Sequence, residues 1–292
     1  MKNKTYKIET ALNKLQSKEY SWEGITQLFE LEKIDNEQLL INACYDSFWL
    51  VRWGATEKIA NLKISGAINT LLEMLEDPDK DVQNNVIKAI DICSKSSIKP
   101  LALRCCDHNV LIQEFAINYI QKNIITYYQE LELLILHESW FIANKLLLIL
   151  FQELKSKIEP LLLKSIKVSN TQRHSIMMLA IIGTKKAIPC FIEYYRVPKL
   201  KRHIIEALGV MDKDIAYPRL IDYLNFQEVS KTVQEIILKI NVPILKYLIQ
   251  RLSDKRMQKD ILFCIKKMPL ENKEKESVNK FLESLQVQER II

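Results

Sequence analysis

The 292-residue sequence has few of the residues that form turns, hold metals or carry out catalysis. Its 5 glycines and 8 prolines are fewer than a sheet-rich chain of this length needs for its turns. It has 4 histidines and 6 cysteines, and no two cysteines form a CxxC pair, so the spacing typical of a zinc site is missing. We therefore expect a helical protein with buried free thiols, no metal and no cofactor.

Long apolar runs are also missing. No run approaches the ~20 residues of a membrane-spanning helix. The opening segment MKNKTYKIETALNKL is basic but lacks the apolar core of a signal peptide. Hydrophobic residues still make up 48% of the chain and charged residues 27%, which is ordinary for a soluble folded protein. We expect a cytoplasmic protein with no membrane partner.

Positive charge is concentrated in one part of the chain. The formal net charge is +6. Residues 170–270 hold 18 Lys and Arg against 9 Asp and Glu, a net of +9, whereas residues 1–169 hold 20 against 22 and residues 271–292 hold 4 against 5. This asymmetry points to an acidic partner.

Apolar residues recur with a period near thirty. Val51, Ala55, Ile59 and Leu62 fall on one face of a helix at 100° per residue. Further copies of this stripe begin near residues 82, 112, 142, 172, 200, 229 and 257, and one period back from Val51 predicts another near residue 21. The later stripes are Val82, Val86, Ile90, Cys93; Ile112, Ala116, Ile120; Ile142, Leu146, Leu150; Gln172, Ile176, Ala180, Gly183; Leu200, Ile204, Leu208, Met211; Val229, Val233, Ile237, Ile240; and Met257, Ile261, Ile265, Met268.

Prolines between the stripes predict a second helix in each copy. Proline is tolerated in the first helical turn, where its missing N–H would have no partner. The prolines expected to open second helices are Pro100, Pro160, Pro189, Pro218 and Pro243. Each copy is then a helix pair that buries its apolar faces only by stacking on its neighbours.

The repeat resembles the HEAT family, most closely the short ~30-residue form of the phycobilisome lyase subunits. The residues that carry the resemblance are VRWGATEKIANLKISGAINTLLEMLEDPDKDV after Asp46, MMLAIIGTKKAIPCFIEYY at 177–195 and IIEALGVMDKDIAYPRLIDYL at 204–224. The resemblance implies an all-α, right-handed α-solenoid of about eight to nine helix pairs. It divides the chain into an N-terminal capping helix (1–20), a repeat array (21–270) and a C-terminal capping helix with a tail (271–292).

The segment FWLVRWGATEKI places Arg52 between Trp49 and Trp53. The family usually has an arginine at this position, and three aspartates, Asp46, Asp77 and Asp107, each lie five residues before a stripe. The structural interpretation is an Asp–Arg ladder between repeats. Trp49 and Trp53 either pack between repeats or form an aromatic patch for a partner, because tryptophan is a favoured interface residue.

No catalytic constellation is visible. His137–Glu138 is similar to the His-Glu pairs of HEAT-like di-iron hydroxylases, but one pair cannot enclose two irons. Cys105 and Cys106 beside His108 have the wrong spacing for zinc. GAINT and GTKKA are interpreted as turns between helices, not as phosphate-binding loops. We therefore expect that the protein is not an enzyme.

The second helices of the basic segment form the candidate binding surface. Counted from the prolines, Tyr194 and Tyr223 stand at the fifth position and Tyr247 at the fourth, which predicts adjacent columns on a concave side. The candidate residues there are Tyr194, Arg196, Arg219, Tyr223, Lys246, Tyr247 and Arg251, with Tyr195 beside them. Further charge near the first helices comes from Lys199, Lys201, Arg202, Lys255, Arg256 and Lys259. The tyrosines either pack between repeats beside solvated lysines, or line a basic groove.

Two functions remain open. The first is a monomeric protein-interaction module, a scaffold or assembly factor that grips an acidic segment of a protein partner. The alternative is a nucleic-acid-binding protein related to the HEAT-like alkylpurine DNA glycosylases, to which SFWLVRWGA is loosely similar. ESWFIAN at 138–144 lacks the acid of those enzymes, and Glu193, Glu206 and Asp222 interrupt the basic surface. A bilin-lyase role rests on the family resemblance alone.

Overall fold

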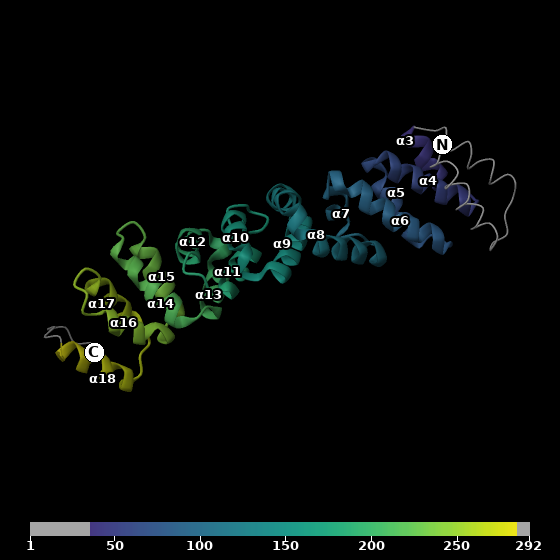
Figure 1. Ribbon diagram of the computed structural model, residues 1–292. Coiled ribbons are helices and arrows are strands. Elements are labelled where there is room, and N and C mark those ends of the chain that lie inside the picture. The colour runs from purple at the N-terminus through teal and green to yellow at the C-terminus, as the bar shows by residue number, and fades with distance from the viewer. Residues whose placement is uncertain (1–35, 285–292) are drawn as a thin grey trace. The chain divides into compact units, whose positions relative to one another are not determined.

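The structure, a computed structural model, describes residues 36–284 (Figure 1). These residues form α-helices and short 3-10 helices, and no β-strand occurs among them. The chain divides into two compact units, Met1–Leu134 and Ile135–Ile292. The capping helix expected at 1–20, the copy expected near residue 21 and the tail after Ser284 lie outside the described residues. Within 36–284, no helix is long and apolar enough to cross a membrane.

The first unit contains two long helices that pack on each other, α4 and α6. Its elements are α3 (Glu37–Ala43), α4 (Trp49–Leu62), η1 (Ser65–Ala67), α5 (Ile68–Glu73), η2 (Met74–Glu76), α6 (Lys80–Cys93), η3 (Ser94–Ser96), α7 (Lys99–Arg104) and the start of α8 (Val110–His137). The shorter α5 packs against α6 and α7. Each long helix therefore meets the next long helix, with a short helix between them in sequence.

The apolar stripes of the first unit are buried, as predicted. Val51, Ala55 and Ile59 of α4 and the whole stripe of α6 lie in the core. Leu62 is the exception, with 42% of its surface exposed. It is the last residue of α4, which Lys63 ends in the left-handed region at φ 56°. The stripe therefore leaves the core at the last residue of the helix.

Element α8 (Val110–His137) consists of two helices joined across a kink at Tyr127 (φ −108°, ψ 15°). The helix pair predicted for this copy is therefore present, with a kink in place of a turn. No glycine or proline occurs between Pro100 and Pro160, so the sequence has no strong breaker that would separate the two helices by a loop. The boundary between the two units falls inside α8, after Leu134.

The second unit arranges its helices in two rows. Its elements are α9 (Trp140–Leu154), η4 (Lys155–Ile158), α10 (Glu159–Ser165), α11 (Gln172–Ile182), α12 (Ala187–Tyr194), η5 (Pro198–Leu200), α13 (Lys201–Val210), α14 (Lys213–Asp222), η6 (Tyr223–Asn225), α15 (Ser230–Ile240), η7 (Val242–Ile244), α16 (Leu245–Arg251), α17 (Gln258–Lys267) and α18 (Asn272–Ser284). Helices α11, α13, α15 and α17 pack on one another in order, and so do α12, α14 and α16. The first row carries the apolar stripes and the second row carries the candidate binding residues.

The stripes of this unit are also largely buried. Every residue of the stripes that begin at Leu200 and Met257 lies in the core. At the edges, Ile142, Val229 and Ile240 are only half-buried. Gly183 is not a core position: it ends α11 as a left-handed cap at φ 73°, a conformation that glycine adopts without strain.

The prolines open the second helices in most copies, but not at Pro218. Pro100 and Pro160 lie in the first turns of α7 and α10, and Pro189 is the third residue of α12. Pro243 lies in η7, just before α16. Pro218 lies inside α14. The helix starts earlier because the Asp212 carboxylate accepts a hydrogen bond from the Asp214 N–H (2.9 Å) and caps it.

One local connection recurs in both units. The side chain directly after the first residue of a stripe donates a hydrogen bond to the backbone carbonyl six residues before it. Gln83 bonds Asp77 O (2.7 Å) and Gln258 bonds Leu252 O (3.1 Å). The same connection joins Gln113 to Asp107 O (3.3 Å) and Arg52 to Asp46 O (2.9 Å). Each one ties the start of a long helix to the preceding turn.

Candidate functional site

Arg52 is held inside the first unit. Its Nε lies 2.7 Å from Asp77 Oδ2 and its Nη2 donates to Asp77 Oδ1 (2.9 Å), a two-pronged ion pair. The side chains of Arg52 and Asp77 are only 11% and 4% exposed. The hydrogen bond to Asp77 is the largest cause of the raised pKa of Arg52. Of the predicted Asp–Arg ladder, the Arg52–Asp77 pair forms, whereas Asp46 accepts a hydrogen bond from the Phe48 N–H and Asp107 pairs with Arg104.

Trp49 and Trp53 belong to the same unit. Both are half-buried on α4. The Trp53 carbonyl accepts hydrogen bonds from Thr56 Oγ1 (2.7 Å) and from Asn85 Nδ2 of α6 (3.0 Å). This part of α4 is thus fastened to α6, and the groove described next is built from the second unit alone.

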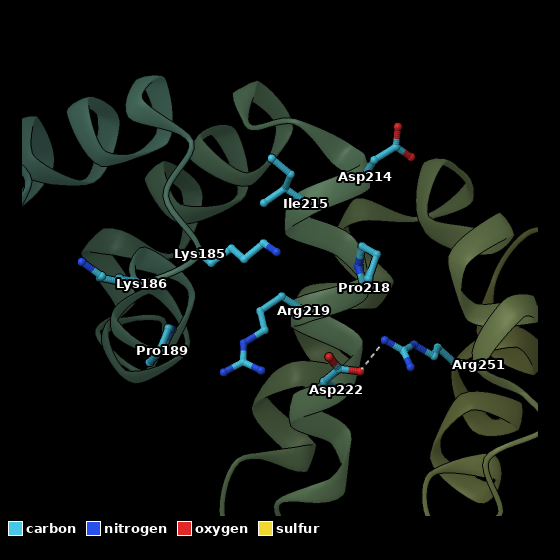
Figure 2. A pocket seen from close by; sticks show the side chains of 9 residues that line it. All are labelled: Lys185, Lys186, Pro189, Asp214, Ile215, Pro218, Arg219, Asp222 and Arg251. Carbon is cyan, nitrogen blue, oxygen red and sulfur yellow. Dashed lines mark ion pairs between the residues drawn. The ribbon is translucent and has the colours of Figure 1, made fainter. Parts of the chain in front are cut away.

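An open groove of about 540 Å³ runs along α12, α14 and α16 (Figure 2). We call it the basic groove. Its lining residues are Lys185, Lys186, Pro189, Asp214, Ile215, Pro218, Arg219, Asp222 and Arg251. Arg219 and Arg251 were predicted for this surface. The groove thus brings four cationic side chains together with two carboxylates.

Two of the four cations have a carboxylate partner. Arg251 Nη2 lies 3.0 Å from Asp222 Oδ1, and Lys186 Nζ lies 3.1 Å from Glu159 Oε1. Lys185 and Arg219, by contrast, reach into the space between α12 and α14 (Figure 2). Among the described residues, no carboxylate lies within ion-pair distance of either one. Lys185 and Arg219 are therefore positioned to receive an anion.

Arg219 is supported by aromatic rings. Its Cζ lies 5.3 Å from the centre of the Tyr223 ring, one helical turn later, at cation–π distance. The Tyr223 ring in turn lies 5.4 Å from the Phe226 ring. Tyr223 is half-buried and Phe226 is exposed. The rings steady the guanidinium and leave its hydrogen-bond donors free for a ligand.

Tyr247 fastens α16 to α14. Its hydroxyl donates to Asp214 Oδ1 (2.6 Å), and its ring meets the buried Tyr217 edge-on at 5.4 Å. The hydrogen bond to Asp214 is the main cause that raises the pKa of Tyr247 to about 12. The Lys246 ammonium lies 5.4 Å from the Tyr247 ring centre. Lys246 and Tyr247 thus adjoin the end of the groove that contains Asp214.

Two of the three predicted tyrosines lie at matching ends of their helices: Tyr194 is the last residue of α12 and Tyr223 directly follows α14. Tyr247 differs, because it is the third residue of α16. Pro243 lies before its helix, whereas Pro189 and Pro218 lie inside theirs, so a count from the prolines does not compare equivalent positions at Tyr247. Tyr247 lies beside the start of α14 and Tyr223 at its end.

The remaining predicted residues lie around this site. Arg196 Nη2 donates to the Glu228 carbonyl (2.9 Å), which ties the end of α12 to the loop after α14. Tyr194 is half-buried, and Tyr195 is a core residue. The charges near the first helices are partly neutralised by three ion pairs: Lys201–Glu235 (3.2 Å), Arg202–Glu206 (2.7 Å) and Arg256–Asp254 (2.7 Å). The basic groove holds four of the 18 Lys and Arg of residues 170–270.

Sequence reasoning missed Lys185, Lys186 and Phe226. The two lysines lie in the GTKKA turn, which we interpreted only as a connection. The signal was present, since adjacent lysines directly precede a second helix of the basic segment. Phe226 was missed because it lies in a loop, outside any helical pattern.

The cysteines and histidines of the described residues are dispersed over both units. No group of three or more His, Cys, Asp or Glu among them could hold a metal ion. Burial raises the pKa of the Cys44 and Cys264 thiols to about 12 and that of Cys93 to about 11. Such thiols remain protonated near neutral pH and are poor nucleophiles. His137 is exposed at the end of α8.

Comparison with known proteins adds no assignment. No protein-family model and no curated protein matches the chain. Among solved structures, the crystal structure of an engineered protein from the Northeast Structural Genomics Consortium is similar, at 14% sequence identity. The match covers 86% of this chain and 97% of that one, with a TM-score of 0.21. A superposition this poor supports no argument about fold or function.

Proposed function

We propose that this chain is a non-enzymatic interaction module that grips an acidic segment of a protein partner in its basic groove. We further propose that its helix pairs are HEAT-like repeats of a right-handed α-solenoid, acting as a cytoplasmic scaffold or assembly factor. The repeat proposal is supported by the two rows of helices in the second unit. It is also supported by the recurring side-chain bond to the carbonyl six residues back.

The observation that carries the binding proposal is the pair of cations without a carboxylate partner. Lys185 and Arg219 reach into the same open groove (Figure 2), whereas the neighbouring Lys186 and Arg251 are paired. A concave surface with an excess of positive charge attracts and orients a partner of negative charge. The carboxylates of an acidic protein segment would form ion pairs with both cations.

A protein partner fits the groove better than a nucleic acid. Asp214 and Asp222 also line it, and they would lie against a continuous phosphate backbone. A nucleic-acid interface is usually much more positively charged than this. A protein segment carries separate carboxylates, so it can place them on Lys185 and Arg219 and leave the two aspartates undisturbed.

The proposal can be tested with a displayed library of random peptides and the full chain as bait. We expect the recovered peptides to be enriched in Asp and Glu over the starting library. The double variant Lys185→Glu/Arg219→Glu should abolish this enrichment, because it reverses both free cations. A matched control is Lys231→Glu/Lys239→Glu, which makes the same charge change on exposed residues of α15 and should keep the enrichment.

Two results would contradict the proposal. The first concerns the acidic enrichment. If it survives the groove variant, binding takes place elsewhere. If it is lost equally in the α15 variant, it is an effect of net charge. The second is tight binding of a mixed-sequence DNA duplex with a steep loss of affinity between about 50 mM and about 200 mM salt. That result, if lost in the groove variant, would favour the nucleic-acid alternative.

A further inference from the structure

An exposed aromatic surface adjoins Arg219 of the basic groove, at the end of α14. Phe226 has 58% of its surface exposed, and its ring lies beside that of Tyr223. We call Tyr223 and Phe226 the aromatic step. Large exposed rings beside a charged groove are typical of binding surfaces, because Phe and Tyr bury much apolar area on contact.

The aromatic step has a fixed backbone. The Phe226 N–H donates to the Tyr223 carbonyl (3.1 Å). The Phe226 carbonyl accepts from the N–H groups of Val229 (3.0 Å) and Ser230 (2.9 Å). Arg196 holds the same loop through the Glu228 carbonyl. A surface that is already ordered loses little conformational entropy when a partner binds.

The distance from Arg219 to the Phe226 ring limits the spacing between the two groups of a ligand that would contact both. The Arg219 Cζ is 5.3 Å from the Tyr223 ring centre, which is 5.4 Å from the Phe226 ring centre. The guanidinium therefore lies at most about 11 Å from the Phe226 ring. An extended peptide spans about 3.3–3.6 Å per residue, so about three residues cover this distance.

We infer that the basic groove recognises a two-part motif in an extended protein segment. Carboxylates bind Lys185 and Arg219, and an apolar side chain within about three residues of them packs on Phe226 and Tyr223. This inference rests on the proposed function and specifies its ligand. The number of free cations also limits the negative charge that a ligand can neutralise. With two free cations, the groove favours a short acidic and apolar segment over a long polyanion.

The inference can be tested by fluorescence anisotropy with labelled synthetic peptides and the full chain. The parent peptide contains Glu-Glu-Ser-Ser-Leu between Gly-Ser flanks, and a second peptide contains the reversed order, because the geometry does not fix chain direction. One of the two should bind about tenfold more tightly than the same peptide with Ser in place of Leu, the gain expected for burying one aliphatic side chain. A peptide with eight Ser residues between the second Glu and Leu should lose most of that gain, because a long flexible spacer no longer holds Leu near Phe226.

Variants of the protein complete the test. Phe226→Ala should weaken the Leu peptide about tenfold and leave the Ser peptide unchanged. Phe263→Ala is the matched control, since Phe263 of α17 is also exposed and lies outside the groove. It should change neither affinity.

The outcomes separate the motif from the proposed function. If the peptides bind and Lys185→Glu/Arg219→Glu abolishes binding, but neither Leu nor Phe226 matters, the motif is wrong and the groove still binds acidic segments. If poly-Glu of equal length binds as tightly as the Leu peptide, the motif is wrong as well. If no acidic peptide binds the unmodified chain, the proposed function fails and the motif with it.

Discussion

Arg52 in the first unit and Arg219 in the second show two uses of the same side chain. Arg52 is nearly buried and is held by Asp77 and two backbone carbonyls. Arg219 is exposed, rests on the Tyr223 ring and has no carboxylate within ion-pair distance among the described residues. A buried charge must be paired inside the protein, whereas an exposed charge is solvated by water and can bind a ligand. The first arginine therefore contributes to folding and the second is available for binding.

The largest effect that would test this comparison concerns the partner of Arg52. Asp77→Ala leaves a nearly buried guanidinium without its anion, so we expect a loss of about 3–5 kcal/mol in the free energy of unfolding. Arg219→Ala should change it by about 0.5 kcal/mol or less, as is usual for an exposed side chain. Urea unfolding followed by circular dichroism measures both. Equal losses in the two variants would contradict the division between a structural and a binding arginine.

A smaller effect is expected from freeing a second arginine in the groove. Asp222→Asn removes the partner of Arg251 and adds a third unpaired cation. We expect the affinity for the Glu-Glu-Ser-Ser-Leu peptide to rise about two- to fivefold, the usual range for one exposed ion pair. Anisotropy titrations at two salt concentrations should also show a steeper salt dependence.

The control for that experiment is Asp254→Asn. Asp254 pairs with Arg256 outside the groove, so the variant makes the same charge change elsewhere. An equal gain in both variants would mean that net charge, and not the basic groove, sets the affinity.

The smallest effect concerns one tyrosine in each unit. The pKa of both Tyr119 and Tyr247 is raised to about 12. Burial is the largest cause for Tyr119, whereas the hydrogen bond to Asp214 is the largest for Tyr247. Asp214→Asn should therefore lower the pKa of Tyr247 towards 10, while Asp91→Asn should leave most of the shift at Tyr119. Titration by NMR with labelled tyrosine measures both.

The sign of the linked stability follows from these shifts. A raised tyrosine pKa means that the folded state favours the neutral phenol. The stabilisation is complete below the unfolded pKa of about 10 and is lost as the pH rises from there towards about 12. An unchanged pKa of Tyr247 in Asp214→Asn would show that the hydrogen bond is not its main cause.

The helical stripes could be predicted because burial repeats with the helical period. Val82, Ile204 and Ile261 are all fully buried, since a helix packed on its neighbours buries one face. The errors occurred where a local signal competes with the pattern. The Asp212 cap starts α14 ahead of Pro218, and the lack of glycine and proline after Pro100 reduces the expected turn in α8 to a kink at Tyr127.

The candidate site was predictable only in part. The excess of positive charge and the placement of Arg219 and Arg251 on second helices follow from the sequence. The pairing of the cations does not, because Asp222 and Arg251 lie 29 residues apart and meet only when α14 and α16 pack side by side. Lys185 became a site residue for the same reason, since it reaches the groove from a turn.

The sequence by itself determined that the chain is helical, which faces of its helices are buried and that one segment carries the excess of positive charge. These properties depend on the order of neighbouring residues and on the 3.6-residue period. Only the tertiary structure decided which charges cancel and which remain free in the basic groove. The energy of an ion pair depends on the distance between its atoms, and that distance is set by helices that are far apart in the sequence.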